Sequence, residues 1–96
     1  MPVKRRVRQF RLSGKAIRNL RDFYEEIARE LPLPEYFGRN LDALWDVLTT
    51  DIEGPIELIW EDSADSQKSL GKTFDKISAL LREVERERGD FKVHLR

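Results

Sequence analysis

The sequence predicts a small α/β domain in which helices pack on a mostly parallel β-sheet, and three observations support this fold class. The 96 residues fit a single domain. Three short segments have the apolar run or alternation of strands, whereas the segments between them repeat apolar residues at helical spacing. The resulting order of strand, helix, helix, strand, helix and strand is typical of parallel strands joined by helical crossovers.

The first strand and the first helix lie in the N-terminal third. A run rich in β-forming residues predicts a strand over 7–12. Asn19 is a good N-cap, and apolar residues then recur every three or four positions, which predicts a helix over 20–31. Pro32 and Pro34 end this helix, because proline has no amide hydrogen to donate.

A second helix and the central strand follow. Asn40 caps a predicted helix over 41–48, in which leucines form one stripe and two acids with a tryptophan form a neighbouring stripe. The segment over 56–60 is almost wholly apolar, so we expect a central strand that is covered on both faces.

The C-terminal third adds a helix and a last strand. The polar segment over 64–70 predicts no more than a helical turn. Apolar residues at helical spacing predict a helix over 72–88. Strict alternation over 91–95 predicts a strand with one buried face.

Charge is segregated along the chain, although the net charge is zero. Residues 1–21 contain eight basic residues and no acid, residues 22–66 have a net charge of −11, and residues 67–96 have a net charge of +3. If the fold does not interleave these blocks, they form opposed charged patches. The alternative is a set of ordinary solvated faces.

Composition excludes several kinds of site and location. Without cysteine, and with His94 as the single histidine, the chain should have no disulfide, no metal site and no cofactor. No apolar run approaches the roughly 20 residues of a membrane span, and the basic start lacks the apolar stretch of a signal peptide. We therefore expect one cytoplasmic domain over 1–96, with a solvated or frayed basic extension over 1–7.

Two acids on the second predicted helix are candidates for a binding surface. Asp42 and Asp46 are four residues apart, so their carboxylates lie near each other and repel by about 0.2–0.5 kcal/mol if exposed. Trp45 lies on the same side of the helix, and Tyr36 and Phe37 lie in the loop before it. These residues are either a binding surface of acids and aromatics, or a helix-start acid with a solvated neighbour and a tryptophan at the core edge.

Catalysis is improbable on chemical grounds. Paired carboxylates can act as acid and base, but the chain has no combination of nucleophile and base and no glycine-rich phosphate loop. We therefore predict no catalytic residues. The arginine block could bind RNA phosphates, yet the aromatic residues that would add stacking are mostly placed next to acids.

The segment over 33–48, LPEYFGRNLDALWDVL, resembles the barstar family of intracellular inhibitors of the secreted ribonuclease barnase. The string P-E-Y followed by G-x-N-L-D-A-L-W-D carries the resemblance. Comparable residues lie along most of the remaining chain: Gly14, Ile17, Asp22, Leu31, Pro55, Trp60, Arg82 and Glu83.

The resemblance implies a three-stranded parallel sheet and a helix with its preceding loop that plug a ribonuclease active site. Asp46 resembles the carboxylate that takes the place of the substrate phosphate, and Asp42 resembles the second acid facing the basic rim. Tyr36 and Trp45 resemble aromatic contacts of the loop and the helix. The further partner-binding residues that we expect are Phe37, Gly38, Asn40, Leu41, Thr49, Glu53 and Glu83.

The function implied is that of a non-catalytic cytoplasmic immunity protein, a monomer that inhibits a secreted or toxin-type ribonuclease in a 1:1 complex. It would bind no membrane, no cofactor and no nucleic acid directly. Two alternatives remain. One is a barstar-like interaction module with a partner that is not a ribonuclease, and the other is an RNA-binding domain that uses Arg5, Arg6 and Arg8.

The chain departs from the family pattern at three positions of the proposed surface. Arg39 stands where an acid is expected, Phe37 replaces a tyrosine, and Asp51 replaces an aromatic residue. These differences change the charges, the hydroxyl groups and the aromatic rings that the surface presents. They leave both barnase and another ribonuclease open as the target.

Overall fold

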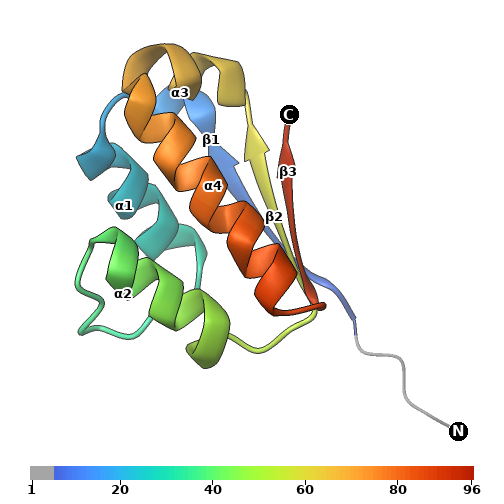
Figure 1. The fold of residues 1–96 in the computed structure, drawn as a ribbon. Coiled ribbons are helices and arrows are strands. Elements are labelled where there is room, and N and C mark those ends of the chain that lie inside the picture. Colours follow the sequence, from blue (N-terminus) through green and yellow to red (C-terminus); the bar gives the residue numbers. More distant parts are fainter. Residues whose placement is uncertain (1–5) are drawn as a thin grey trace, which may run out of the picture.

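The computed structural model describes residues 6–96, and it confirms a three-stranded parallel sheet packed with helices (Figure 1). The strands are β1 (Arg8–Ser13), β2 (Ile56–Glu61) and β3 (Phe91–Leu95), hydrogen-bonded in the order β1-β2-β3. The helices are α1 (Leu20–Glu30), α2 (Leu41–Asp46), α3 (Ser63–Leu70) and α4 (Lys72–Glu87). A 3-10 turn (Gly14–Ala16) follows β1, and a π-helical turn (Val47–Asp51) extends α2.

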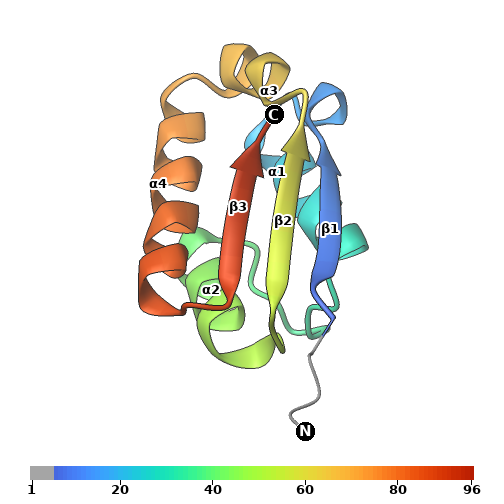
Figure 2. The same ribbon diagram turned by 90° about the vertical axis from the view of Figure 1, so that its right-hand side faces the viewer.

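Helices α1, α2 and α4 lie on one side of the sheet, and Figure 2 shows its other face toward the viewer. The sequence predicts that β2 is covered on both faces, and helices cover only one of them. Ile59 on the open face is nevertheless only 1% exposed. Its register neighbours Arg11 and His94 contact Glu61 at 2.6 Å and Glu57 at 2.9 Å, so long polar side chains replace a helical cover there.

The core lies between the sheet and the helices and is centred on Trp60. This indole is fully buried, is stacked on Phe23 at a centroid distance of 5.4 Å, and lies 5.1 Å from the ring of Phe74. Rings from β2, α1 and α4 therefore meet at one point, where aromatic pairs contribute about 0.5–1.5 kcal/mol beyond their buried area.

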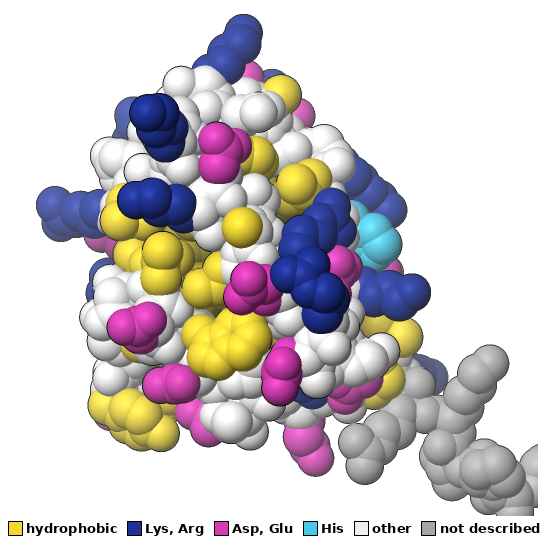
Figure 3. All heavy atoms as spheres, viewed as in Figure 1, with side chains coloured by type: hydrophobic (Ala, Val, Ile, Leu, Met, Phe, Trp, Pro, Cys, Tyr) yellow, Lys and Arg dark blue, Asp and Glu magenta, His cyan; other side chains and the backbone are white. Residues whose placement is uncertain are grey.

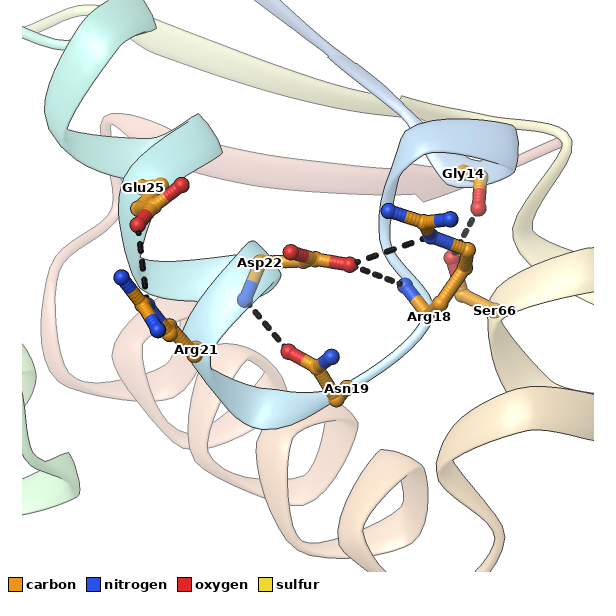
Figure 4. Close-up of polar contacts among 7 residues, drawn as sticks. All are labelled: Gly14, Arg18, Asn19, Arg21, Asp22, Glu25 and Ser66. Carbon is orange, nitrogen blue, oxygen red and sulfur yellow. Dashed lines mark hydrogen bonds and ion pairs between the residues drawn. The ribbon is translucent and has the colours of Figure 1, made fainter.

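The polar segment before α4 is a helix of eight residues, α3, and not only a turn as the sequence predicts. Its anchor is Ser66, whose hydroxyl accepts a hydrogen bond from Trp60 Nε1 at 3.0 Å. The same hydroxyl donates to the carbonyl of Gly14 at 2.8 Å, a contact that Figure 4 shows. A Cβ at Gly14 would lie 2.4 Å from the Glu61 carbonyl oxygen, so this close approach requires glycine. The helix thus depends on contacts with distant segments.

The fold interleaves the charge blocks of the sequence. Arg11 of the basic block pairs with Glu61, and Figure 4 shows Arg18 paired with Asp22 and Arg21 with Glu25. The opposed patches that block segregation predicts are therefore largely replaced by local ion pairs. Lys4 and Arg5 of that block, and most of the extension over 1–7, lie outside the described residues.

No helix in the described part of the chain combines the length and apolar character needed to span a membrane.

Candidate functional site

Asn40 and Arg39 fix the start of the helix that carries the acidic residues. Asn40 is the N-cap of α2, and its Oδ1 accepts a hydrogen bond from the amide of Ala43 at 2.7 Å. Arg39 has a φ of 52°, in the left-handed region that favours glycine. The Asn40 side chain also donates to the carbonyl of Gly38 at 3.3 Å, which closes the turn between loop and helix.

Helix α2 divides its side chains between core and solvent. Leu44 and Leu48 are buried, whereas Asp42 and Asp46 are exposed and Trp45 is half-buried. Among the described residues neither carboxylate is in an ion pair. Two unpaired negative charges and an indole edge are thus available to a partner.

The loop before α2 presents one aromatic ring and buries part of another. Tyr36 is 81% exposed. Phe37 is half-buried, and its ring lies edge-on to that of Tyr24 at a centroid distance of 6.0 Å. Burial raises the pKa of the Tyr24 hydroxyl above its usual value. Phe37 therefore attaches the loop to α1, while Tyr36 projects from it.

An open hollow of about 430 Å³ lies between α2 and α4. It is lined by Leu41, Asp42, Trp45, Lys76, Ala79, Leu80 and Glu83. Figure 3 shows this side of the molecule, with hydrophobic side chains exposed among acidic and basic ones. Four residues predicted from the sequence thus come together here: Leu41, Asp42, Trp45 and Glu83.

A second hollow of about 360 Å³ adjoins the first at the N-terminal end of α2. It shares Leu41 and Asp42 with the first hollow and is otherwise lined by Leu20, Tyr24, Arg39 and Asn40. Sequence reasoning assigned no binding role to the residues that α1 and α4 add to these hollows: Leu20, Tyr24, Lys76, Ala79 and Leu80. Helical spacing places Lys76, Ala79 and Glu83 on one face of α4, but it cannot say that this face meets α2.

The remaining predicted residues lie along or after the C-terminal half of α2. Asp46 and Glu53 are exposed, and Thr49 is half-buried with its hydroxyl donating to the carbonyl of Trp45 at 2.7 Å. Arg88 holds this region by donating to the carbonyls of Leu48 and Ile52, each at 2.8 Å.

The arrangement suits binding to another protein. Both hollows are open, and in the part of the chain that the structure describes no group of three or more potential ligands is placed to hold a metal ion. The surface offers aromatic rings beside apolar hollows, which are typical of the centres of protein interfaces. Its unpaired carboxylates add charge that is complementary to a basic partner.

Comparison with known proteins shows a family and a relative that this chain resembles. The family model described as Barstar (barnase inhibitor) matches residues 7–96. The "Putative ribonuclease inhibitor YrdF" of Bacillus subtilis (strain 168) is 31% identical over 88 residues, which are 91% of this chain and 97% of that protein.

Proposed function

The chain belongs to the barstar family, and we propose that it inhibits a ribonuclease by covering the active site of the enzyme with α2 and the preceding loop. The protein acts as a binding partner, in a 1:1 complex, and not as an enzyme. Its place is the cytoplasm of the cell that produces the ribonuclease, because there an inhibitor protects the cell's own RNA.

The pair of unpaired carboxylates on α2 is the observation that carries this proposal. A ribonuclease must bind the phosphates of RNA with cationic side chains. Asp46 offers a carboxylate to that site in place of a phosphate, and Asp42 lies one helical turn away, about 6 Å along the axis. Since Asp42 and Asp46 repel each other in the free protein, a cationic cleft relieves a cost that the fold alone does not offset.

The aromatic residues supply the rest of the contact. Tyr36 is almost fully exposed in the loop, and Trp45 stands half-buried at the wall of the hollow between α2 and α4. Large rings that lose water on binding provide much of the energy of protein interfaces. Tyr36 lies in the loop before α2, and Trp45 lies on α2 between the two acids. We therefore expect the rings to exclude water from the charge contacts that Asp42 and Asp46 make.

Direct binding of nucleic acid is not part of this function. The arginines of the first block that could hold phosphates are partly engaged, since Arg11, Arg18 and Arg21 are in ion pairs. The most exposed aromatic ring, Tyr36, follows Glu35 in the acidic part of the chain. A polyanion would therefore meet like charge where it needs stacking.

Steady-state cleavage of RNA by a panel of bacterial ribonucleases, barnase among them, tests the proposal. The wild-type protein should inhibit at least one enzyme stoichiometrically, and Asp46→Ala should remove the inhibition. Asp65→Ala is the matched control, because Asp65 is an exposed acid on α3, away from the site.

Thermal unfolding shows whether each variant is folded. Asp46→Ala should leave the thermal midpoint unchanged or slightly raised, since it removes a repulsion. A folded Asp46→Ala variant that inhibits like the wild type would contradict the site. Absence of inhibition across the whole panel would favour a partner of another class.

A further inference from the structure

Two basic side chains line the hollows beside the acids of α2, and they take part in no ion pair among the described residues. Lys76 lines the hollow between α2 and α4 together with Asp42, and Arg39 lines the adjoining hollow, also together with Asp42. Asp42 is therefore flanked by a cation in each hollow, and it is bonded to neither.

Most other arginines on the helical side of the molecule are neutralised within the chain. Figure 4 shows two of these pairs at the start of α1, where Arg18 lies 3.3 Å from Asp22 and Arg21 lies 3.2 Å from Glu25. On α4, Arg82 and Arg86 pair in the same way with Glu85 and Glu83. Arg39 and Lys76 thus differ from these paired arginines in that their charge is left for a partner. They differ from Lys68 and Lys72, which are also unpaired in the described part of the chain, in that they line the hollows beside Asp42.

Local structure keeps both cations at the surface. Arg39 occupies a left-handed backbone position directly before the N-cap Asn40, so its place is fixed by the turn that starts α2. Lys76 is exposed in the second turn of α4. Neither position is buried by the core, and neither side chain is needed to cap a helix.

We propose that Arg39 and Lys76 select the partner by binding carboxylate side chains on the rim of the ribonuclease. These carboxylates lie beside the cationic cleft that receives Asp46, so the proposal rests on the proposed inhibitor function. The partner is therefore a ribonuclease with a mixed rim, acidic opposite Arg39 and Lys76 and basic opposite Asp42 and Asp46.

The same two residues disfavour an enzyme whose rim is basic throughout. Like charges that face each other across an interface weaken binding and slow association. Specificity arises as much from such repulsion as from attraction. Arg39 and Lys76 therefore leave the general affinity of the acids for an RNA-binding cleft intact, and they restrict it to one kind of ribonuclease.

The test compares two probes of opposite net charge, barnase as the basic microbial ribonuclease and an acidic microbial ribonuclease with an isoelectric point of about 4. Dissociation constants are measured for the wild type and for the double variant Arg39→Glu, Lys76→Glu. The control is Lys15→Glu, Lys68→Glu, which changes the net charge equally at two exposed lysines outside both hollows. Arg39→Gly is an additional variant that removes the charge and suits the φ of 52°.

Selectivity is the ratio of the two dissociation constants. The double variant should shift it toward the basic enzyme by about 100-fold, and by at least about 10-fold more than the control, whose charges act only at long range. Arg39→Gly should shift it in the same direction by a smaller factor.

A shift equal to that of the control, or a shift toward the acidic enzyme, would overturn the inference alone, because inhibition through Asp46 would persist. Absence of binding to both enzymes by every variant would overturn the inference, and inhibition of the ribonuclease panel then decides whether the proposed function falls with it.

Discussion

Arg88 Nη1 lies 2.8 Å from the carbonyl oxygen of Leu48, so a side chain after the end of α4 holds the last turn of the helix that carries the two acids. The same nitrogen reaches the carbonyl of Ile52 at 2.8 Å, and the other guanidinium nitrogens contact Asp90 at 2.7 and 3.0 Å. A Cβ at Gly54 would lie 2.1 Å from the Asp90 carboxylate, so the chain leaves room for this pair. The widened π-helical turn is therefore held from outside the helix.

Replacement of Arg88 by lysine tests this support. Lysine keeps the charge but has no planar fork, so Arg88→Lys should lose at least one carbonyl contact and destabilise the fold by about 1–2 kcal/mol. Unfolding in urea measures the change. Arg86→Lys is the control, because the Arg86 side chain is exposed and its pair with Glu83 is long at 3.7 Å; it should change stability by no more than about 0.5 kcal/mol. Equal effects of the two substitutions would show that Arg88 does not hold the turn.

The N-cap of α2 should matter for binding as well as for stability. Asn40→Ala removes the acceptor for the Ala43 amide, which should cost about 1 kcal/mol and weaken inhibition, since the helix start places Asp42. Asn19→Ala is a close control, because Asn19 caps α1 in the same way by accepting from the Asp22 amide at 2.8 Å. It should lower stability to a similar degree and leave inhibition unchanged once folded. If Asn40→Ala and Asn19→Ala weakened inhibition equally, the N-cap of α2 would have no specific role in placing the binding residues.

The buried hydroxyl of Ser66 should be a strong determinant of stability. Ser66→Ala leaves Trp60 Nε1 without its acceptor and removes one of the two donors to the Gly14 carbonyl, so we expect a loss of about 1–3 kcal/mol in the free energy of unfolding. Ser69→Ala, at an exposed position on the same helix, should be almost neutral. Thermal unfolding of the two variants compares them directly, and a neutral Ser66→Ala variant would contradict the role given to this hydroxyl.

Stability should fall at alkaline pH through Tyr24. Burial raises the pKa of its hydroxyl in the folded protein, while the unfolded chain has the ordinary value of about 10. The contribution of the neutral hydroxyl is therefore fully present below about pH 10 and is lost as the pH rises through the folded pKa. Tyr24→Phe should remove this alkaline loss, whereas Tyr36→Phe should keep it because Tyr36 is 81% exposed. A decline in Tyr24→Phe identical to that of the wild type would assign the effect to other groups.

Elements with local signals could be predicted from the sequence. The caps Asn19 and Asn40 mark the starts of α1 and α2, and the alternation over 91–95 marks β3. Helix α3 has no comparable signal, because its anchor Ser66 bonds to partners 6 and 52 residues away. The open face of the sheet escaped prediction for a similar reason, since Ile59 is covered by side chains of three strands and not by a helix.

The part of the site that one continuous segment provides could be predicted from the sequence. The acids and aromatics over 36–46 lie within eleven consecutive residues, so their spacing places them on one loop and one helix. Lys76 and Leu80 come from α4, some 30 residues further along the chain, and no local pattern tells which face of α4 meets α2. That contact creates the hollow, and only the packed structure shows it.

Kinetics of inhibition at several RNA concentrations test the central claim most directly, that α2 occupies the active site of a ribonuclease. For an enzyme that the protein inhibits, the account predicts competitive inhibition, in which the apparent inhibition constant rises linearly with the RNA concentration and kcat is unchanged. An inhibition constant that is independent of RNA, with a lowered kcat, would place the contact outside the active site and contradict the account.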